Sequence, residues 1–235
     1  MIRFYAPDIA TDPVLPENDS HHCVKVLRMQ SGDSMEIIDG KGGLYHCRML
    51  EPHSKHATVE VIRCERLPLP WSYNLTVAVA PTKNMDRMEW LTEKLTEIGI
   101  NTIVPVLCAR SERKEIKTER LEKIAVSAMK QSLKAVLPDV MPMTQLKTFL
   151  ETCKASQRFI AYCDSETERK DMIGIAGNKT DTAILIGPEG DFTADEVALA
   201  RQHGFDPVTL GDNRLRTETA ALYAASAIHI INQFT

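Results

Sequence analysis

The fold is decided by two stretches, AILIGPEGDF from Ala183 to Phe192 and PVTLGDNRLRTETAAL from Pro207 to Leu222. Each begins with a short apolar run that ends at a glycine, Gly187 or Gly211. Such runs are typical of strands buried on both faces of a parallel sheet. Open α/β sheets bind ligands at the carboxyl ends of their strands. We therefore expect the two loops that begin at these glycines to lie together and to form a ligand site.

Charged residues crowd the second loop, where Arg214, Arg216 and Glu218 stand beside the start of a helix. Charges of both signs are costly at such a place unless they are solvated, paired or used in function. An Arg216–Glu218 ion pair with a purely structural role is the alternative to a catalytic role. The GPEG turn alone is weaker evidence, because a β-turn before a capping box of Thr193 and Glu196 would also explain it.

The pair of motifs IGPEG and LG-x-x-x-LR-T-E-T-A resembles the carboxyl-terminal signature of the SPOUT methyltransferases. More narrowly, it is similar to the family that methylates N3 of a uridine in 16S ribosomal RNA. The stretches HHCVKVLRMQSGD, IIDGKGG and PTKNMDRMEWLTEKLTEIGI resemble other parts of that family, so the resemblance covers most of the chain. It implies an α/β fold with a trefoil-knotted parallel sheet, a small amino-terminal PUA-like β-barrel domain, and S-adenosylmethionine as cofactor.

A proline-rich linker, Pro68-Leu69-Pro70, divides the chain. We expect a PUA-like RNA-binding domain over residues 1–70 and a SPOUT methyltransferase domain over residues 73–235. Alternating residues in 34–39, 44–51 and 57–65 predict a β-meander or small barrel in the first domain. A short helix is expected from His21 to Leu27, with Asp19 or Ser20 as its cap.

The second domain is predicted to alternate strands and helices, with an amphipathic helix from Met85 to Ile98. Residues 164–181 read as a polar loop. The last helix, 217–234, is apolar nearly all round, which is typical of a buried helix. The resemblance implies a homodimer packed through this helix, and burial within one chain is the alternative.

Carried over by motif position, the resemblance assigns a cofactor shell to the two loops and the start of the last helix. Its members are Gly187, Glu189, Gly190, Leu210, Gly211, Leu215, Arg216 and Ala220. Within these loops, two positions depart from the family pattern. Relatives often carry an arginine where this chain has Asn213, one position before Arg214, and a glycine where it has Asp191.

Uracil N3 carries a proton, so its methylation needs a base or a cation that lowers its pKa. We expect Arg216 to hydrogen-bond the developing uracil oxyanion. Glu218 would act as the base or orient Arg216. Both are therefore the predicted catalytic residues, and the chemistry requires no metal.

Basic residues gather between Arg110 and Lys134. This segment contains eight Lys and Arg but only four Glu, in a chain of net charge −4. This surplus predicts either a solvated helix face with i,i+4 pairs or a surface that contacts RNA phosphates. Arg28 ends the first helix, where it would suit the helix dipole or an RNA phosphate. The candidate RNA-binding residues are Arg28, Arg110, Arg113 and Lys114.

Composition is ordinary for a globular protein, with 43% hydrophobic and 26% charged residues. We expect neither a membrane-spanning run nor a signal peptide. The six scattered cysteines form no CxxC pair, which favours reduced thiols in a cytoplasmic protein. The histidines near the amino terminus lack ligand spacing, so no metal site is expected.

The sequence therefore predicts a cytoplasmic, dimeric methyltransferase acting on N3 of a 16S RNA uridine in the small ribosomal subunit, position 1498 by resemblance. Three alternatives stay open. A SPOUT enzyme could methylate another rRNA or tRNA nucleotide, or the chain could be a non-catalytic RNA-binding protein. It could also be a nucleotide-binding α/β enzyme, although no GxGxxG motif is present.

Overall fold

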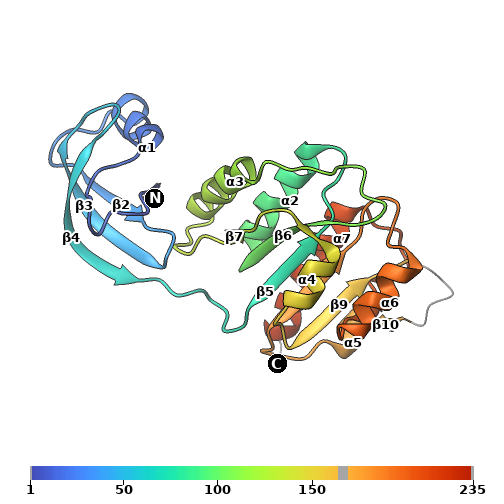
Figure 1. Ribbon diagram of the computed structural model, residues 1–235. Helices are drawn as coiled ribbons and strands as arrows, with labels where there is room; N and C mark the ends of the chain where they lie inside the picture. Colours follow the sequence, from blue (N-terminus) through green and yellow to red (C-terminus); the bar gives the residue numbers. More distant parts are fainter. Residues whose placement is uncertain (1, 164–168, 234–235) are drawn as a thin grey trace. The chain divides into compact units, whose positions relative to one another are not determined.

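The computed structural model describes residues 2–163 and 169–233, and the chain separates into two compact units. The first comprises Met1–Trp71 and Ala125–Leu137, and the second comprises Ser72–Ile124 and Pro138–Thr235 (Figure 1). The predicted boundary between residues 70 and 73 stays a proposal. The proline-rich linker did not predict one feature of this division: by their contacts, residues 125–137 belong to the first unit.

The first unit is built on a four-stranded sheet in the order β1-β2-β3-β4. β1 and β2 pair in parallel, and the other pairs are antiparallel. Phe4, Ile37 and Met49 lie in the core that covers one face of this sheet. The strands are β1 (Arg3–Tyr5), β2 (Ser34–Ile38), β3 (Gly43–Glu51) and β4 (Thr58–Arg66).

The first helix begins earlier than expected. α1 (Glu17–His21) runs directly into a π-helical turn, η1 (His22–Val26), so the predicted caps Asp19 and Ser20 lie inside the helix and that prediction is wrong. The reason is that both side chains are used elsewhere. Asp19 accepts the Tyr5 N–H at 2.8 Å and pairs with Lys130 at 2.5 Å. The Ser20 hydroxyl bonds backbone groups outside the helix.

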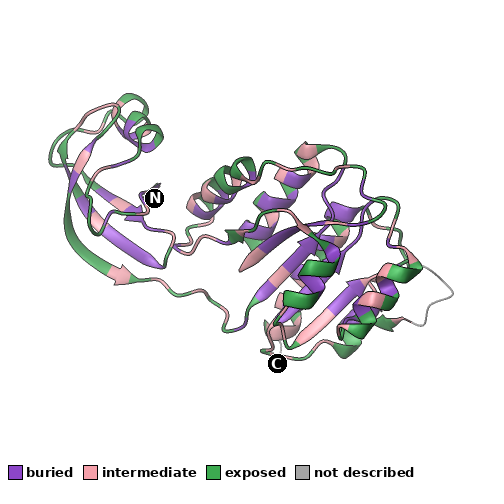
Figure 2. Ribbon diagram, viewed as in Figure 1, coloured by how far each residue is buried: buried purple, intermediate pink, exposed green. Residues whose placement is uncertain are grey.

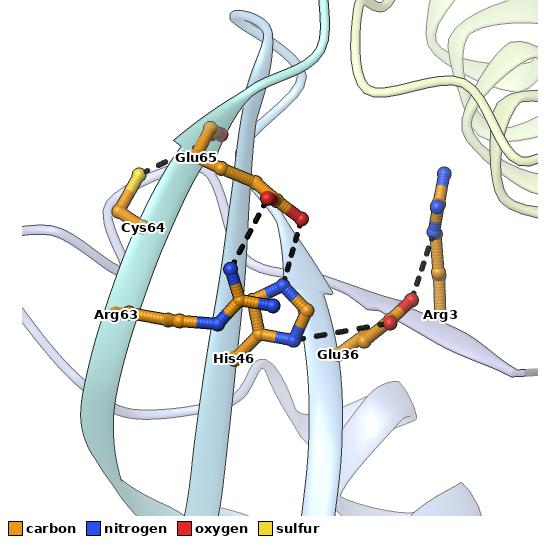
Figure 3. A network of polar contacts seen from close by, with 6 residues as sticks. All are labelled: Arg3, Glu36, His46, Arg63, Cys64 and Glu65. Carbon is orange, nitrogen blue, oxygen red and sulfur yellow. Dashed lines mark hydrogen bonds and ion pairs between the residues drawn. The ribbon is translucent and has the colours of Figure 1, made fainter.

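A polar network crosses the four strands (Figure 3). His46 on β3 lies 2.8 Å from Glu65 on β4 and 3.9 Å from Glu36 on β2. Glu36 in turn lies 3.2 Å from Arg3 on β1. The hydrogen bond with His46 lowers the pKa of Glu65. Side chains from neighbouring strands thus fix the pairing of the sheet through charge as well as through its apolar core.

The second unit contains a parallel sheet in the order β10-β12-β9-β11-β5-β6-β7, and β8 pairs with β6. β11 is buried at every residue and β5 at all but one, as the apolar runs predict, whereas β9 mixes buried and intermediate residues (Figure 2). The strands are β5 (Leu75–Val79), β6 (Thr102–Leu107), β7 (Asp139–Val140), β8 (Thr144–Gln145), β9 (Gln157–Ala161), β10 (Lys170–Asp171), β11 (Thr182–Ile186) and β12 (Asp206–Thr209).

Helices complete the α/β architecture. α7 packs on β5 and β11 and on α2. A core that includes Ile160, Leu185 and Phe205 joins strands of the sheet to α4 and α6. The helices of this unit are α2 (Met85–Ile98), α4 (Leu146–Thr152), α5 (Met172–Ile175), α6 (Ala194–Gln202) and α7 (Thr217–Gln233). α3 (Thr118–Gln131) begins in this unit and continues into the first from Ala125.

The α/β class and the parallel sheet are confirmed, while the trefoil knot stays a prediction. Two expectations need correction. The segment 169–181, expected as polar loop, contains β10 and α5, and residues 164–168 lie outside the described residues. α7 was expected to be buried, but on this helix Tyr223 is 43% exposed and Ile230 is 53% exposed. The expected end of the helix, at residue 234, lies outside the described residues.

Candidate functional site

The two glycine loops meet at the carboxyl edge of the sheet, as the sequence predicts. β11 and β12 both pair in parallel with β9, so they end at one edge with a single strand between them. The Thr217 hydroxyl, at the start of α7, donates a hydrogen bond to the Gly187 carbonyl at 3.0 Å. This buried bond ties the start of one loop to the end of the other.

The glycines of these loops differ in what a side chain at each position would meet. Gly211 has φ +97° and no atom within 4 Å of the place that a β-carbon would occupy. A β-carbon on Gly187 would lie 3.0 Å from the Phe192 ring, and one on Gly190 would lie 3.3 Å from Arg110 Cβ. Gly211 therefore leaves backbone open to a ligand, while Gly187 and Gly190 allow close packing within the protein.

Glu189 connects the GPEG turn to the loop that precedes α2. One of its carboxylate oxygens accepts the Lys83 N–H at 3.1 Å. The Lys83 ammonium lies 3.0 Å from Glu112. The Glu189 side chain, expected to contact cofactor, thus has a structural contact that positions the turn.

Glu218 is the most unusual residue of the site. Its side chain is 9% exposed, and one carboxylate oxygen lies 3.7 Å from Arg87 Nε on α2. The other oxygen is buried without a hydrogen-bond partner in the described structure. A buried carboxylate oxygen without a partner is costly, so it indicates a place for a donor from a ligand. The ion pair of Glu218 is with Arg87, not with Arg216 as the structural alternative assumed.

A cavity of about 590 Å³ opens beside Glu218. It brings the predicted catalytic residues together with residues of α2 that the sequence did not assign to chemistry. Trp90 is 41% exposed and offers an aromatic surface. The lining residues are Asp86, Arg87, Trp90, Arg214, Leu215, Arg216, Glu218 and Thr219.

Asp191 takes the backbone conformation that explains why a glycine suits this position. Its φ is +60°, in the left-handed region that glycine and, less often, aspartate adopt. Its carboxylate accepts the Cys163 N–H at 3.0 Å and the Phe192 N–H at 2.8 Å. Burial, and then the Asp191 charge, raise the pKa of the Cys163 thiol. Asp191 therefore ties the end of β9 to the GPEG turn.

The candidate RNA-binding residues fall into two groups. Arg28, which is exposed and has φ +56°, follows η1 in the first unit, and Lys114 is exposed in the second. Arg110 donates to the carbonyls of Gly190 and Phe192, and Arg113 donates to those of Thr82 and Lys83. The sequence did not predict these inward contacts.

Fold and site together define a class of protein: an α/β protein with a candidate ligand site at the carboxyl edge of a parallel sheet, in a chain that also carries a small β-sheet unit. The family model described as an RNA methyltransferase domain matches residues 69–229. The model described as an RNA methyltransferase PUA domain matches residues 15–62. Since the first match spans well over half of the sequence, the chain belongs to the RNA methyltransferase family.

Relatives and solved structures agree with this membership. The chain is similar to the crystal structure of a probable rRNA methyltransferase from Porphyromonas gingivalis, with 44% identity, a TM-score of 0.95, and coverage of 100% and 99% of the two chains. A ribosomal RNA small subunit methyltransferase E from Neisseria gonorrhoeae, solved with S-adenosyl methionine, gives 28% identity, a TM-score of 0.86 and full coverage of both chains. The Synechocystis protein of that name is 29% identical, over 90% of this chain and 70% of the relative.

Among the described residues, no group of histidine, cysteine and acidic side chains is arranged to hold a metal ion. No helix in the described part of the chain is long and apolar enough to span a membrane.

Proposed function

We propose that this protein transfers a methyl group from S-adenosylmethionine to N3 of a uridine in the 16S RNA of the small ribosomal subunit. The observation that carries the proposal is the Glu218 carboxylate: one of its oxygens is buried without a partner among the described residues, and the residue lines a cavity at the edge of the glycine loops. The names of the relatives and the cofactor in the Neisseria structure support the same chemistry. Position 1498 rests on the resemblance alone.

The loop residues fit the cofactor by their chemistry. The open backbone at Gly211 allows close approach, and Leu210, Leu215 and Ala220 are half-buried apolar neighbours suited to an adenosyl group. S-adenosylmethionine supplies an electrophilic methyl group when bound. The proposed shell is the one that the motifs assign: Gly187, Glu189, Gly190, Leu210, Gly211, Leu215, Arg216 and Ala220.

The cavity beside Glu218 suits the acceptor base. Trp90 offers a surface on which an unstacked uracil can lie, since bases commonly stack on aromatic side chains. In the proposed step the Glu218 oxygen takes the N3 proton, the N3–carbon bond forms and the sulfur–carbon bond breaks. Arg216 stabilises the developing charge on a uracil oxygen. Arg87 keeps the other Glu218 oxygen engaged, so that the free one faces the substrate.

We also propose that the protein is a homodimer and that a second copy covers the exposed face of α7. Tyr223 and Ile230, seven residues apart, lie on one side of this helix and are large, apolar and exposed. Exposed apolar side chains grouped on a helix are typical of protein interfaces. A ribosomal RNA substrate would place the enzyme in the cytoplasm, with Arg28 and Lys114 as candidate phosphate contacts.

The test is methyl transfer from labelled S-adenosylmethionine to small ribosomal subunits, large subunits and tRNA, each taken from cells that lack this protein. Transfer confined to small subunits supports the proposal. Transfer to another RNA favours the alternative SPOUT substrate. If the protein binds no S-adenosylmethionine and transfers nothing, the non-catalytic RNA-binding alternative takes its place.

A further inference from the structure

The loop from Cys108 to Lys114, here called the clamp loop, follows β6 and contains the first residues of the basic segment. It contacts the GPEG turn of the proposed cofactor site. Its own shape is held at two points. The Cys108 N–H donates to the Ser111 hydroxyl at 3.0 Å, and Ser111 is buried. The Ala109 N–H donates to Glu196, the capping-box residue of α6, at 2.7 Å. The backbone of the clamp loop is therefore held in place independently of the contacts that its two arginine side chains make.

Arg110 holds the GPEG turn. Its Nη1 donates to the Gly190 carbonyl at 2.9 Å and to the Phe192 carbonyl at 3.3 Å. Its side-chain stem lies so close to Gly190 that an added β-carbon there would be 3.3 Å from Arg110 Cβ and 3.5 Å from Cδ. A β-carbon at Gly190 would therefore crowd the Arg110 side chain. Two independent observations, hydrogen bonds and packing, place Arg110 on the turn.

Arg113 holds the loop before α2 in the same way. Its Nε donates to the Thr82 carbonyl at 3.2 Å, and its Nη2 donates to the Lys83 carbonyl at 2.6 Å. The Lys83 N–H bonds Glu189 of the GPEG turn. This loop leads into α2, where Arg87 contacts Glu218. A single arginine therefore fixes a loop that touches both the proposed cofactor shell and the proposed base.

We propose that Arg110 and Arg113 are positioning residues that hold the two loops of the methyl-transfer site, instead of the RNA-phosphate contacts that their basic surroundings predict. The inference rests on the proposed function for the identity of the cofactor. Guanidinium N–H groups bonded to four backbone carbonyls are committed to the protein, and removing either side chain leaves its carbonyls without these donors.

The experiment compares Arg110→Ala, Arg113→Ala, their lysine variants and the matched control Lys117→Ala, an exposed basic residue of the same segment. Affinity for S-adenosylmethionine is measured by calorimetry, and affinity for small subunits is measured over a range of salt. We expect each alanine variant to weaken cofactor binding about tenfold or more, since a hydrogen bond to a charged group contributes about 1.5–3 kcal/mol and 1.4 kcal/mol is tenfold. The salt dependence of RNA binding should stay as in the wild type. The lysine variants should recover part of the cofactor affinity, and Lys117→Ala should leave the cofactor affinity unchanged.

A second readout separates this inference from the proposed function. Amide hydrogen exchange in 187–192 should accelerate in Arg110→Ala, and exchange in 82–87 should accelerate in Arg113→Ala, whether or not S-adenosylmethionine is the cofactor. If the wild type binds no S-adenosylmethionine but these changes in exchange occur, the proposed function is wrong, while the positioning role of Arg110 and Arg113 is supported. Unchanged exchange, or unchanged cofactor affinity with a salt slope reduced by about one, would overturn the inference in favour of phosphate contact.

Discussion

Arg87 Nε lies 3.7 Å from one oxygen of the Glu218 carboxylate, and the other oxygen of that carboxylate is buried without a partner in the described structure. The two residues come from the first turns of α2 and α7, which pack together. The cation holds the carboxylate, and Glu218 lines a cavity that Arg216 and Trp90 also line. With one oxygen paired and the other unpaired, the Glu218 carboxylate is suited to accept one proton from a substrate.

Replacing Glu218 by glutamine should slow methyl transfer about 10²- to 10⁴-fold, the usual contribution of a general base. The amide is nearly the same size but takes no proton, so S-adenosylmethionine affinity should change little. Single-turnover transfer and calorimetry measure the two effects. Wild-type transfer by Glu218→Gln would remove Glu218 from the chemistry.

Replacing Arg87 by alanine should also slow transfer, but less than the Glu218 change, because the base remains and loses only its orientation. Lysine at this position should restore part of the rate, since it keeps the charge without the planar guanidinium. The comparison is made on the rate of transfer at saturating cofactor. An Arg87→Ala enzyme slower than Glu218→Gln would instead assign Arg87 a direct part in the reaction.

Aspartate at Tyr223 or Ile230 should convert the proposed dimer into a monomer, because a charge would be buried at the interface without a partner. Sedimentation equilibrium gives the mass directly. The control is Met141→Asp, an exposed apolar residue that follows β7 at the edge of the sheet, which should leave the mass unchanged. A wild-type protein that is already monomeric would refute the dimer proposal.

The Cys163 thiol provides a test of the Asp191 contact. Burial and the neighbouring carboxylate raise its pKa, so little thiolate is present near neutral pH. Asp191→Asn removes the charge that raises the pKa, and the fraction of thiolate at a fixed pH should therefore rise. Alkylation of Cys163, followed by peptide mass spectrometry at pH 8, should become faster in this variant. The exposed Cys64 in the first unit is the internal control, and equal acceleration of both would point to general loosening.

Much of the second unit follows from the sequence. The apolar runs around Ile186 and Val208 predict buried parallel strands, and the structure has β11 and β12 there. The capping box of Thr193 and Glu196 forms as predicted at the start of α6. These features are predictable because they depend on local pattern and on the burial of one continuous segment.

The features that local pattern did not reveal are contacts between distant segments. Basic residues at Arg110 and Arg113 look alike whether they meet a phosphate or a backbone carbonyl, so charge alone could not separate the two. The pairing of Glu218 with Arg87 depends on how α7 packs on α2. The membership of 125–137 in the first unit depends on the packing of the end of α3, which no linker signal marks. Arg87 stands at a helix start, where a positive charge opposes the helix dipole, and such a position favours an acidic partner.

The central claim is best tested by expressing the wild-type protein in cells that lack this gene, isolating 16S RNA and identifying its modified nucleosides by mass spectrometry. We predict that 3-methyluridine appears at one position with the wild type and is absent or strongly reduced with Glu218→Gln expressed at the same level. A different methylated nucleoside, or 3-methyluridine that is restored equally by Glu218→Gln, would contradict the account.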